Sequence, residues 1–152
     1  MFKIRQGHPE DADLLSDLAF RAKAHWGYDA DFMEACRGEM TYHETDFPSY
    51  YFAVAENPQV VGFYSLGFLT ELETELNALF VDPDQLGKGY GRALLNHAKI
   101  QARVFDAKSI IIISDPHAVE FYKANGAQLC GERPSESIPD RMLPLLSLPL
   151  NR

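Results

Sequence analysis

Residues 76–105 constrain the fold most, because they predict a strand, a glycine-spaced turn and a helix in direct succession. The apolar strand ends at an Asp-Pro pair. Gly87, Gly89 and Gly91 then remove three β-carbons from one turn, so that backbone N–H groups can approach a bulky anion. The turn leads straight into the first turn of a helix, where unpaired amides and the helix dipole favour phosphate. This stretch therefore predicts an anion site.

Basic side chains concentrate in the same segment. Residues 85–105 contain no acid and four basic residues, Lys88, Arg92, Lys99 and Arg103, which fall on one helical stripe. The whole chain has 14 basic and 22 acidic residues, so the remainder is strongly acidic and the predicted anion site is local. The spacing of the glycines alone does not exclude an ordinary strand-to-helix turn beside a solvated helix face.

Two common phosphate-binding motifs do not fit. The dinucleotide fingerprint needs Gly or Ala where Arg92 or Leu94 stands, and a P-loop needs Gly-Lys-Ser/Thr, which the turn lacks. The pattern that fits is V-x-P-x-x-x-G-K-G-x-G-x-x-L-L, which is formed here by Val81, Pro83, Gly87, Lys88, Gly89, Gly91, Leu94 and Leu95. This stretch resembles the pyrophosphate loop of the GCN5-related N-acetyltransferases. That family usually has Gln or Arg where this chain has Leu86, which implies weaker side-chain help to a site made mostly of backbone amides.

A second block carries the same resemblance. Residues 115–127, DPHAVEFYKANGA, are similar to the family's N-P-x-A-x-x-F-Y-E-K-x-G-F, with Asp115 in place of Asn and Ala127 in place of Phe. Together the blocks cover the C-terminal two-thirds of the chain. The first third, which usually chooses the acceptor in this family, resembles it only in layout. The resemblance implies direct transfer of acetyl from the cosubstrate acetyl-CoA to an amine in a ternary complex.

The resemblance also implies a set of cosubstrate-binding residues. They are Leu79, Phe80, Val81, Gly87, Lys88, Gly89, Tyr90, Gly91, Arg92, Asp115, Ala118 and Tyr122. The pantetheine arm would pair with the backbone of residues 79–81, where the strands of this fold splay apart. A non-catalytic acyl-CoA-binding or regulatory module on the same fold is the alternative, and the presence of both Glu75 and Tyr122 weighs against it.

Amine acetylation benefits from a base, because an alkylamine with a pKa near 10.4 is only about one part in a thousand neutral at pH 7. Glu75 is our candidate, since the resemblance places a catalytic glutamate on the strand before the loop. Strand alternation puts Glu73, Glu75 and Asn77 on one face, where they could bind the acceptor and neighbouring carboxylates would raise one another's pKa. A solvated strand end and proton transfer through a water chain are the alternatives.

Aromatic residues supply the other candidates. Tyr122 matches the family's tyrosine in the helix after the fifth strand, and a phenol with a pKa near 10 can protonate a departing thiolate of pKa about 8.5. The alternative is a core aromatic beside Phe121. Trp26 and Tyr28 lie between the first two predicted helices, either as acceptor-binding residues or as a lid over the helix pair, and the resemblance favours the acceptor site.

Length and composition predict one domain spanning residues 1–152, and periodicity predicts the α+β class. The resemblance implies that this domain is an N-acetyltransferase. Strands are expected at 2–6, 50–55, 60–69, 73–81, 109–114 and near 142–148, and helices from 9 to 26, from 29 to 40, up to 105, and from 118 to 125. The run 109–114 is expected to be buried on both faces. Pro144 suggests an edge position or a bulge. The order β-α-α-β-β-β-α-β-α-β-β gives a mixed, mostly antiparallel sheet with helices on both sides, as the resemblance implies.

Composition narrows the remaining choices. No apolar run approaches the roughly 20 residues of a membrane span and the N-terminus lacks a signal segment, which predicts cytoplasmic residence without a membrane partner. A net charge of −8 argues against nucleic acid and suits a cationic acceptor, either a small amine or a protein amino group. Cys36 and Cys130 are predicted to be buried free thiols, and both a monomer and a homodimer remain open. No metal is expected, because no ligand spacing is formed by His8, His25, His43 and His97.

Overall fold

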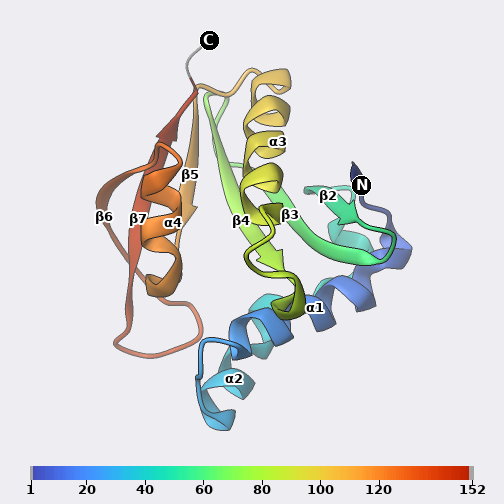
Figure 1. Cartoon of the computed structure of the whole chain (residues 1–152). Helices are drawn as coiled ribbons and strands as arrows, with labels where there is room; N and C mark the ends of the chain where they lie inside the picture. The colour runs from blue at the N-terminus through green and yellow to red at the C-terminus, as the bar shows by residue number, and fades with distance from the viewer. Residues whose placement is uncertain (1, 151–152) are drawn as a thin grey trace.

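A computed structural model describes residues 2–150 of the 152-residue chain. One seven-stranded sheet has the strand order β1-β2-β3-β4-β5-β7-β6, with helices on both faces (Figure 1). The strands are β1 (Lys3–Gln6), β2 (Tyr51–Glu56), β3 (Val60–Phe68), β4 (Glu73–Val81), β5 (Ser109–Ile113), β6 (Gln128–Pro134) and β7 (Met142–Pro149). The helices are α1 (Ala12–Ala24), α2 (Ala30–Cys36), α3 (Tyr90–Val104) and α4 (Val119–Ala124). The predicted α+β class and element order are confirmed.

The sheet is antiparallel except between β4 and β5, which run parallel. These two strands pair only at Glu73–Ser109, Thr74–Ile110 and Glu75–Ile111. Beyond these pairs, β4 continues to Val81 and β5 continues to Ile113, but the two strands no longer pair with each other. A gap therefore opens between them (Figure 1).

A β-bulge lies where β4 and β5 separate. Ser65 of β3 pairs with Ala78, whereas Leu66 pairs with Leu76, so Asn77 is an extra residue on β4. A bulge bends its strand and increases the local twist. We therefore attribute the separation of β4 from β5 to the bulge at Asn77.

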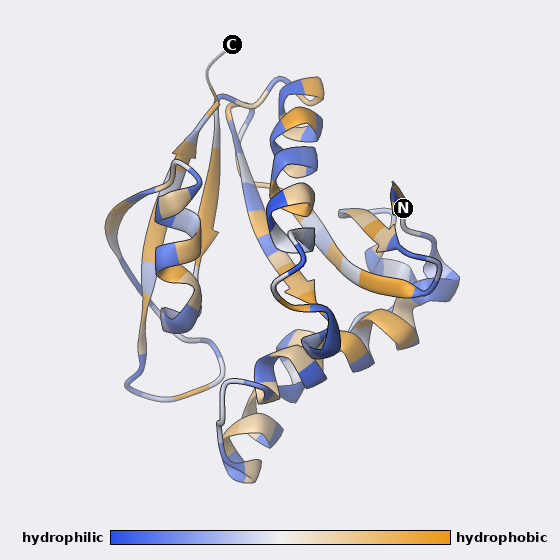
Figure 2. Ribbon diagram, in the orientation of Figure 1, coloured by the Kyte–Doolittle hydropathy of each residue, from blue (hydrophilic) through white to orange (hydrophobic). Residues whose placement is uncertain are grey.

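Two apolar cores hold the helices to the sheet. Leu94, Leu95 and Ala98 of α3 pack on one face together with α4, while Leu15 and Leu18 of α1 pack on the other face together with α2. Figure 2 shows hydrophilic and hydrophobic bands alternating along α3, and a hydrophobic run along β5. Because each helix buries only one side, the bands follow the helical period.

Gly62 allows α3 to lie close to the sheet. A β-carbon there would lie 2.8 Å from the carbonyl oxygen of Phe80 and 3.0 Å from Leu94 Cδ1. We expect Gly62→Ala to lower the free energy of unfolding by about 1–3 kcal/mol, measured by urea denaturation, because the added methyl overpacks this layer. Gly38→Ala is the control, since its β-carbon would meet nothing within 4 Å. Equal stability of the two variants would contradict this account.

Three predicted segments differ from the structure. The second helix is split into α2 and a 3-10 turn, Arg37–Met40. The sequence did not locate β6, because all its residues are exposed and no apolar alternation marks it. β7 is not an edge strand but lies between β5 and β6. The β6–β7 pair contains a bulge, but the extra residue lies on β6. The carbonyl of Pro144 accepts from the amide of Ser114, just after the end of β5. The nitrogen of Pro144 points to the same side, where no strand residue needs an N–H donor, so proline is tolerated.

Two burial predictions are also wrong. Ile110 and Ile112 are buried, but Ile113 is 37% exposed, because the gap beside β4 uncovers the end of β5. Cys130 is exposed because β6 is an outer strand, whereas Cys36 is buried as predicted.

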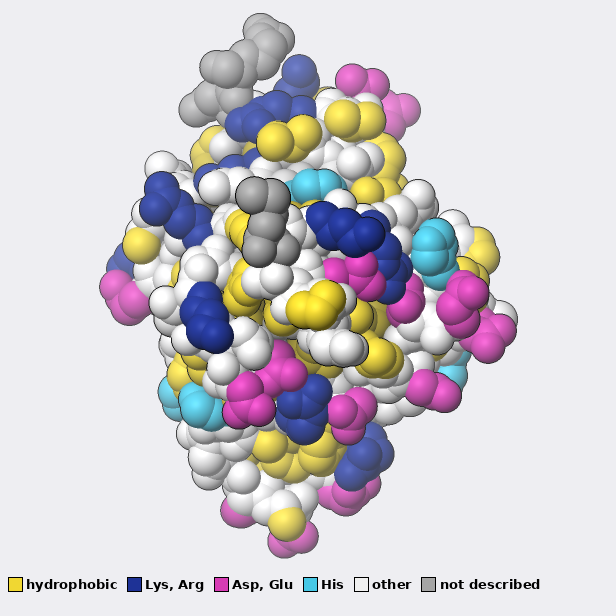
Figure 3. Space-filling view, turned by 45° about the vertical axis from the view of Figure 1, so that its right-hand side comes forward, with side chains coloured by type: hydrophobic (Ala, Val, Ile, Leu, Met, Phe, Trp, Pro, Cys, Tyr) yellow, Lys and Arg dark blue, Asp and Glu magenta, His cyan; other side chains and the backbone are white. Residues whose placement is uncertain are grey.

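Between residues 2 and 150 no helix is long and apolar enough to cross a bilayer. In the same range no three His, Cys, Asp or Glu side chains gather as a metal site. On the face drawn in Figure 3, basic side chains are interspersed with acidic ones.

Candidate active site

The glycine turn has the geometry of an anion site. Gly87 and Gly89 adopt φ values of 79° and 85°, in the left-handed region that favours glycine. Gly89 caps α3, so the amides of Tyr90, Gly91 and Arg92 are the first of the helix and lack intrahelical acceptors. A β-carbon at Gly87 or Gly89 would meet nothing within 4 Å, so the space over the turn is open. These features together fit a phosphate group.

Side chains near the turn differ in their availability. Lys88 Nζ donates to Gln85 Oε1 at 3.0 Å, on the exposed side of the turn. Tyr90 is 6% exposed, and its hydroxyl accepts a hydrogen bond from Asn57 Nδ2 at 2.7 Å. Tyr90 can therefore meet a ligand at the turn through its backbone N–H but not through its side chain.

α3 and α4 meet beside the gap. A β-carbon at Gly91 would lie 3.5 Å from the ring of Phe121, so the two helices approach closely here. Lys99 Nζ donates to the carbonyl of Asn125 at 3.0 Å, at the end of α4. The charge of Lys99 thus serves the packing of α4 and not the glycine turn.

The open edge of β4 lies between the turn and α4. Leu79 and Val81 pack toward the core under α3, and Phe80 packs toward the core under α1. Beyond Glu75, the side of β4 that faces β5 has no strand partner within the described range. An extended ligand could pair with this backbone.

Tyr122 lies on α4 at the other side of the gap. Tyr122 is 7% exposed and belongs to the apolar core that packs under α3. Burial raises the pKa of Tyr122, and the charge of Asp115 raises it further, so the phenol stays protonated. Ala118 closes the 3-10 turn before α4 and is partly buried against the same core.

A cavity of about 530 Å³ opens on the α1 side of the sheet. The predicted residues that line it are Trp26, Glu75, Asn77, Leu79, Phe80 and Asp115. Further polar side chains of the lining were not singled out from the sequence, namely Lys23, Glu39, Asp46, Ser65, Glu136 and Arg141. We call this cavity the acceptor cleft.

Glu75 and Asn77 lie in the acceptor cleft, but Glu73 does not line it. Glu73 lies at the hairpin end of β4, where its carbonyl accepts from the amides of Leu69 and Thr70. Asn77 has room because a β-carbon at Gly67 would lie 2.6 Å from Asn77 Oδ1. The bulge thus presents Asn77 beside Glu75.

The environment of Glu75 suits a base. Burial raises the pKa of Glu75, and the negative charge of Glu136 raises it further, while the Asn77 side chain acts in the opposite direction. A carboxylate with a raised pKa is a better proton acceptor near neutral pH.

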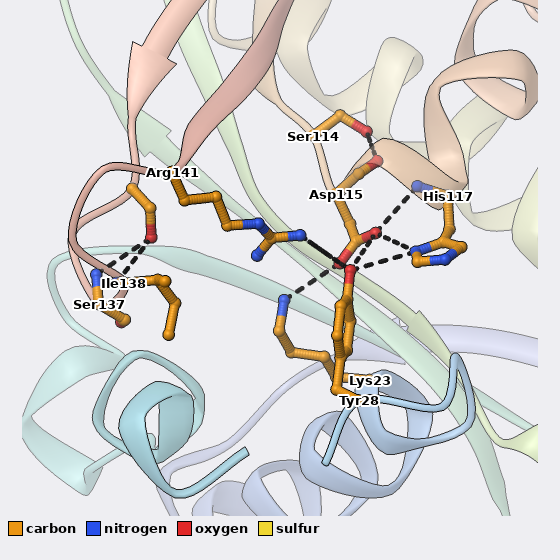
Figure 4. A network of polar contacts seen from close by, with 9 residues as sticks. Lys23, Tyr28, Ser114, Asp115, His117, Ser137, Ile138 and Arg141 are labelled. Carbon is orange, nitrogen blue, oxygen red and sulfur yellow. Dashed lines mark hydrogen bonds and ion pairs between the residues drawn. The ribbon is translucent and has the colours of Figure 1, made fainter. Parts of the chain in front are cut away.

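A polar network closes the cleft at the end of β5 (Figure 4). Asp115 accepts hydrogen bonds from Lys23 Nζ at 3.2 Å and from the Tyr28 hydroxyl at 2.9 Å. His117 donates its backbone N–H to Asp115 at 2.9 Å, and His117 Nδ1 lies 2.8 Å from the same carboxylate. Arg141 Nη2 donates to the Tyr28 hydroxyl at 2.8 Å. We call these five residues the Asp115 network.

Trp26 and Tyr28 occupy different places in this wall. The Trp26 ring stacks on His117 at 4.9 Å and lines the cleft. The Tyr28 ring stacks on Phe32 at 4.1 Å and lies 5.3 Å from both Lys23 Nζ and the Arg141 guanidinium, while its hydroxyl donates to Asp115. Burial and the hydrogen bond to Asp115 raise the pKa of Tyr28 to about 12.

Two of the residues missed from the sequence show why the wall was hard to predict. Lys23 follows Ala19 by four residues on the buried stripe of α1, and a lysine in such a stripe is a signal of buried pairing. Arg141 comes from the irregular connection between β6 and β7, where no pattern marks it.

Comparisons with known proteins agree with this arrangement. The sequence model of the acetyltransferase (GNAT) family matches residues 15–127. The chain is 29% identical over 154 residues to the peptidyl-lysine N-acetyltransferase YjaB of Salmonella typhimurium, covering 97% of each protein. It is 34% identical over 96 residues to YjaB of Escherichia coli, covering 63% of this chain and 60% of that protein.

Solved structures share the fold. The PaiA N-acetyltransferase of Thermoplasma acidophilum in complex with coenzyme A gives a TM-score of 0.76 at 17% identity, over 98% of this chain and 99% of that one. The ribosomal-protein-S18-alanine N-acetyltransferase of Escherichia coli gives 0.73 at 19% identity, over 100% of this chain and 96% of that one. Because the family match spans both the glycine turn and the start of α4, this chain belongs to the acetyltransferase (GNAT) family.

Proposed function

We propose that this member of the family transfers acetyl from acetyl-CoA to the ε-amino group of a lysine side chain in a peptide or protein. The observation that carries the proposal is the charge of the acceptor cleft beside the gap. Four acidic side chains line the cleft in addition to Asp115, namely Glu39, Asp46, Glu75 and Glu136. Carboxylates attract an ammonium group, and apolar walls formed by Met40, Phe52 and Phe80 suit an aliphatic stem. The relatives named peptidyl-lysine N-acetyltransferases support the same acceptor.

The acetyl donor is proposed to lie along the glycine turn and the gap. Its diphosphate would bind at Gly87, Gly89 and the first amides of α3, helped by the charges of Lys88 and Arg92. Its extended arm would pair with the open backbone edge of residues 79–81, with Ala118 and Tyr122 on the opposite side. Acetyl-CoA supplies an activated thioester at the end of this arm.

The reaction requires two proton movements from this chain's residues. Glu75 accepts, directly or through a water, the proton that the ammonium must lose before its nitrogen can bond to the acetyl carbon. Tyr122 donates a hydrogen bond or a proton to the sulfur whose bond to that carbon breaks. The second proton that the bonded nitrogen must lose passes to water or replaces the proton that Tyr122 gave. Asn77 orients Glu75, Trp26 borders the acceptor, and Glu73 acts only through its charge at longer range.

A mass-detected acetylation screen tests the proposal. We expect acetylation of a blocked peptide with a single lysine, accompanied by release of free thiol, and no reaction of the matched peptide with arginine. Reaction only with free amino acids, polyamines or aminoglycosides would replace lysine by a small amine. Binding of CoA without thiol release across the whole panel would favour a non-catalytic module.

Gly89→Val is expected to raise the dissociation constant for CoA at least tenfold by calorimetry, or about 1.4 kcal/mol, because the side chain would occupy the space of the diphosphate. Valine at positive φ also strains the backbone. Gly27→Val controls for that strain, since Gly27 has φ +95° and nothing within 4 Å of its β-carbon. Unchanged affinity in a folded Gly89→Val protein would remove the turn from the cosubstrate site.

Several properties stay predictions within this proposal. They are a single catalytic domain across residues 1–152, cytoplasmic residence, independence of metal, and the absence of nucleic-acid and membrane partners.

A further inference from the structure

The Asp115 network joins segments that are far apart in the chain. Lys23 comes from α1 and Tyr28 from the connection between α1 and α2, while Arg141 comes from the connection between β6 and β7 (Figure 4). Lys23 and Asp115 are 92 residues apart, and Tyr28 and Arg141 are 113 apart. All of these contacts converge on the carboxylate at the end of β5.

The charges of the network depend on this one carboxylate. The side chains of Lys23, Arg141 and Asp115 are only 11%, 17% and 16% exposed. Burial alone would raise the pKa of Asp115, but hydrogen bonds from His117 and the charge of Lys23 outweigh it and hold the pKa below its usual value. Loss of the negative charge would therefore remove the partner that two buried cations share.

The oxygens of Asp115 are occupied by the protein. Oδ1 faces the backbone N–H and Nδ1 of His117, and Oδ2 faces Lys23 Nζ and the Tyr28 hydroxyl. The carboxylate thus points toward α1 and the loop that follows it. Lys23, Trp26 and Arg141 line the acceptor cleft, so the network forms the cleft wall next to β5.

We propose that Asp115 is a positioning residue for the acceptor and not a contact for the cosubstrate. It clamps the α1–α2 and β6–β7 connections to the end of β5, and thereby fixes the wall along which the lysine stem lies. The kinetic part of this inference rests on the proposed function. The position of the α1–α2 connection can be measured without any acceptor.

Trp26 reports that position, because it is the single tryptophan of the chain and stacks on His117 with an interplanar angle of 7°. Asp115→Asn keeps the shape of the side chain but removes its charge. Tyr28→Phe keeps the ring on Phe32 but removes the hydroxyl that links Arg141 to Asp115. In both variants we expect acrylamide to quench Trp26 fluorescence at least about twofold more efficiently, because the connection loosens.

Steady-state kinetics distinguish an effect on acceptor binding from an effect on cosubstrate binding. In both variants the KM for the blocked lysine peptide should rise about tenfold, while kcat and the dissociation constant for CoA stay within about twofold. Asp11→Asn is the matched control. Asp11 is 13% exposed and accepts two hydrogen bonds from Arg5 at 2.9 and 3.0 Å, but it does not line the cleft. It should change neither the quenching nor the KM.

Three outcomes would overturn the inference. The first is a tenfold weaker affinity of Asp115→Asn for CoA with an unchanged KM for the peptide, which would make Asp115 a cosubstrate contact. The second is unchanged quenching in both variants, and the third is an equal change in Asp11→Asn. If Asp115→Asn does not fold, Tyr28→Phe alone decides. If the unaltered protein acetylates no peptide, the proposed function fails while the quenching still tests the clamp.

Discussion

Glu75→Gln is expected to lower turnover by about 10²- to 10⁴-fold and to leave the affinity for CoA nearly unchanged. Glutamine keeps the shape of the side chain but cannot accept the proton of the ammonium. The deficit should be largest near neutral pH, above the pKa of Glu75, where the unaltered enzyme still has its carboxylate base. It should shrink toward the pKa of the amine, near 10.4, where the acceptor is neutral without a base.

The pH profile makes this prediction specific to Glu75. Burial and the charge of Glu136 raise the pKa of Glu75, so turnover of the unaltered enzyme should fall as pH drops through that raised pKa and protonates the base. Glu136→Gln is the comparison, because it removes the neighbouring charge and should move this acid limb of kcat to lower pH while kcat at neutral pH is retained. A full rate for Glu75→Gln across the profile would assign the base to a water chain or another carboxylate.

Tyr122→Phe is expected to lower turnover roughly tenfold or more, with little change in melting temperature or CoA affinity. Tyr122 lies on α4, beside which the thiolate is proposed to depart. Phenylalanine keeps the ring and its packing, so the change should lower the free energy of unfolding by at most the roughly 0.5–1.5 kcal/mol of a typical hydrogen bond.

Tyr64→Phe provides the opposite control. Tyr64 is fully buried, and its hydroxyl lies 2.7 Å from His97 Nδ1, so this variant should lose stability and retain turnover. Steady-state rates and thermal melts on the two variants together distinguish the roles. Normal turnover in Tyr122→Phe would show that Tyr122 is a core aromatic residue beside Phe121 and has no catalytic role.

The fold could be predicted because its signals are local. The glycine turn occupies a few consecutive residues, and α3 shows its apolar stripe within one helix. The order of elements followed from such patterns. β6 was not predicted, because an exposed strand shows no alternation of apolar and polar residues. The division of the second helix into α2 and a 3-10 turn depends on tertiary packing, which intrinsic propensity does not encode.

The candidate site was predictable only in part, for a physical reason. Glu75 and Asn77 could be found by strand alternation, but the bulge that sets Asn77 beside Glu75 depends on its pairing with β3. The partners of Asp115 come from α1 and from an irregular connection, and no spacing in the sequence links them. Contacts between such distant segments follow from the tertiary fold alone.

The gap between β4 and β5 also has a consequence for the protein at rest. Exposed strand edges usually lie at the rim of a sheet, where bulges, charges or short strands protect them from pairing with other chains. Here an unpaired edge lies inside the sheet, and a bound thioester arm would serve as its missing strand. We therefore expect those amides of residues 79–81 that face the gap, and not those that face β3, to exchange their hydrogens faster in the free protein. A ligand at 100 times its dissociation constant adds about 2.7 kcal/mol to native stability, so the supply of CoA would govern how long the folded enzyme persists as well as how fast it works.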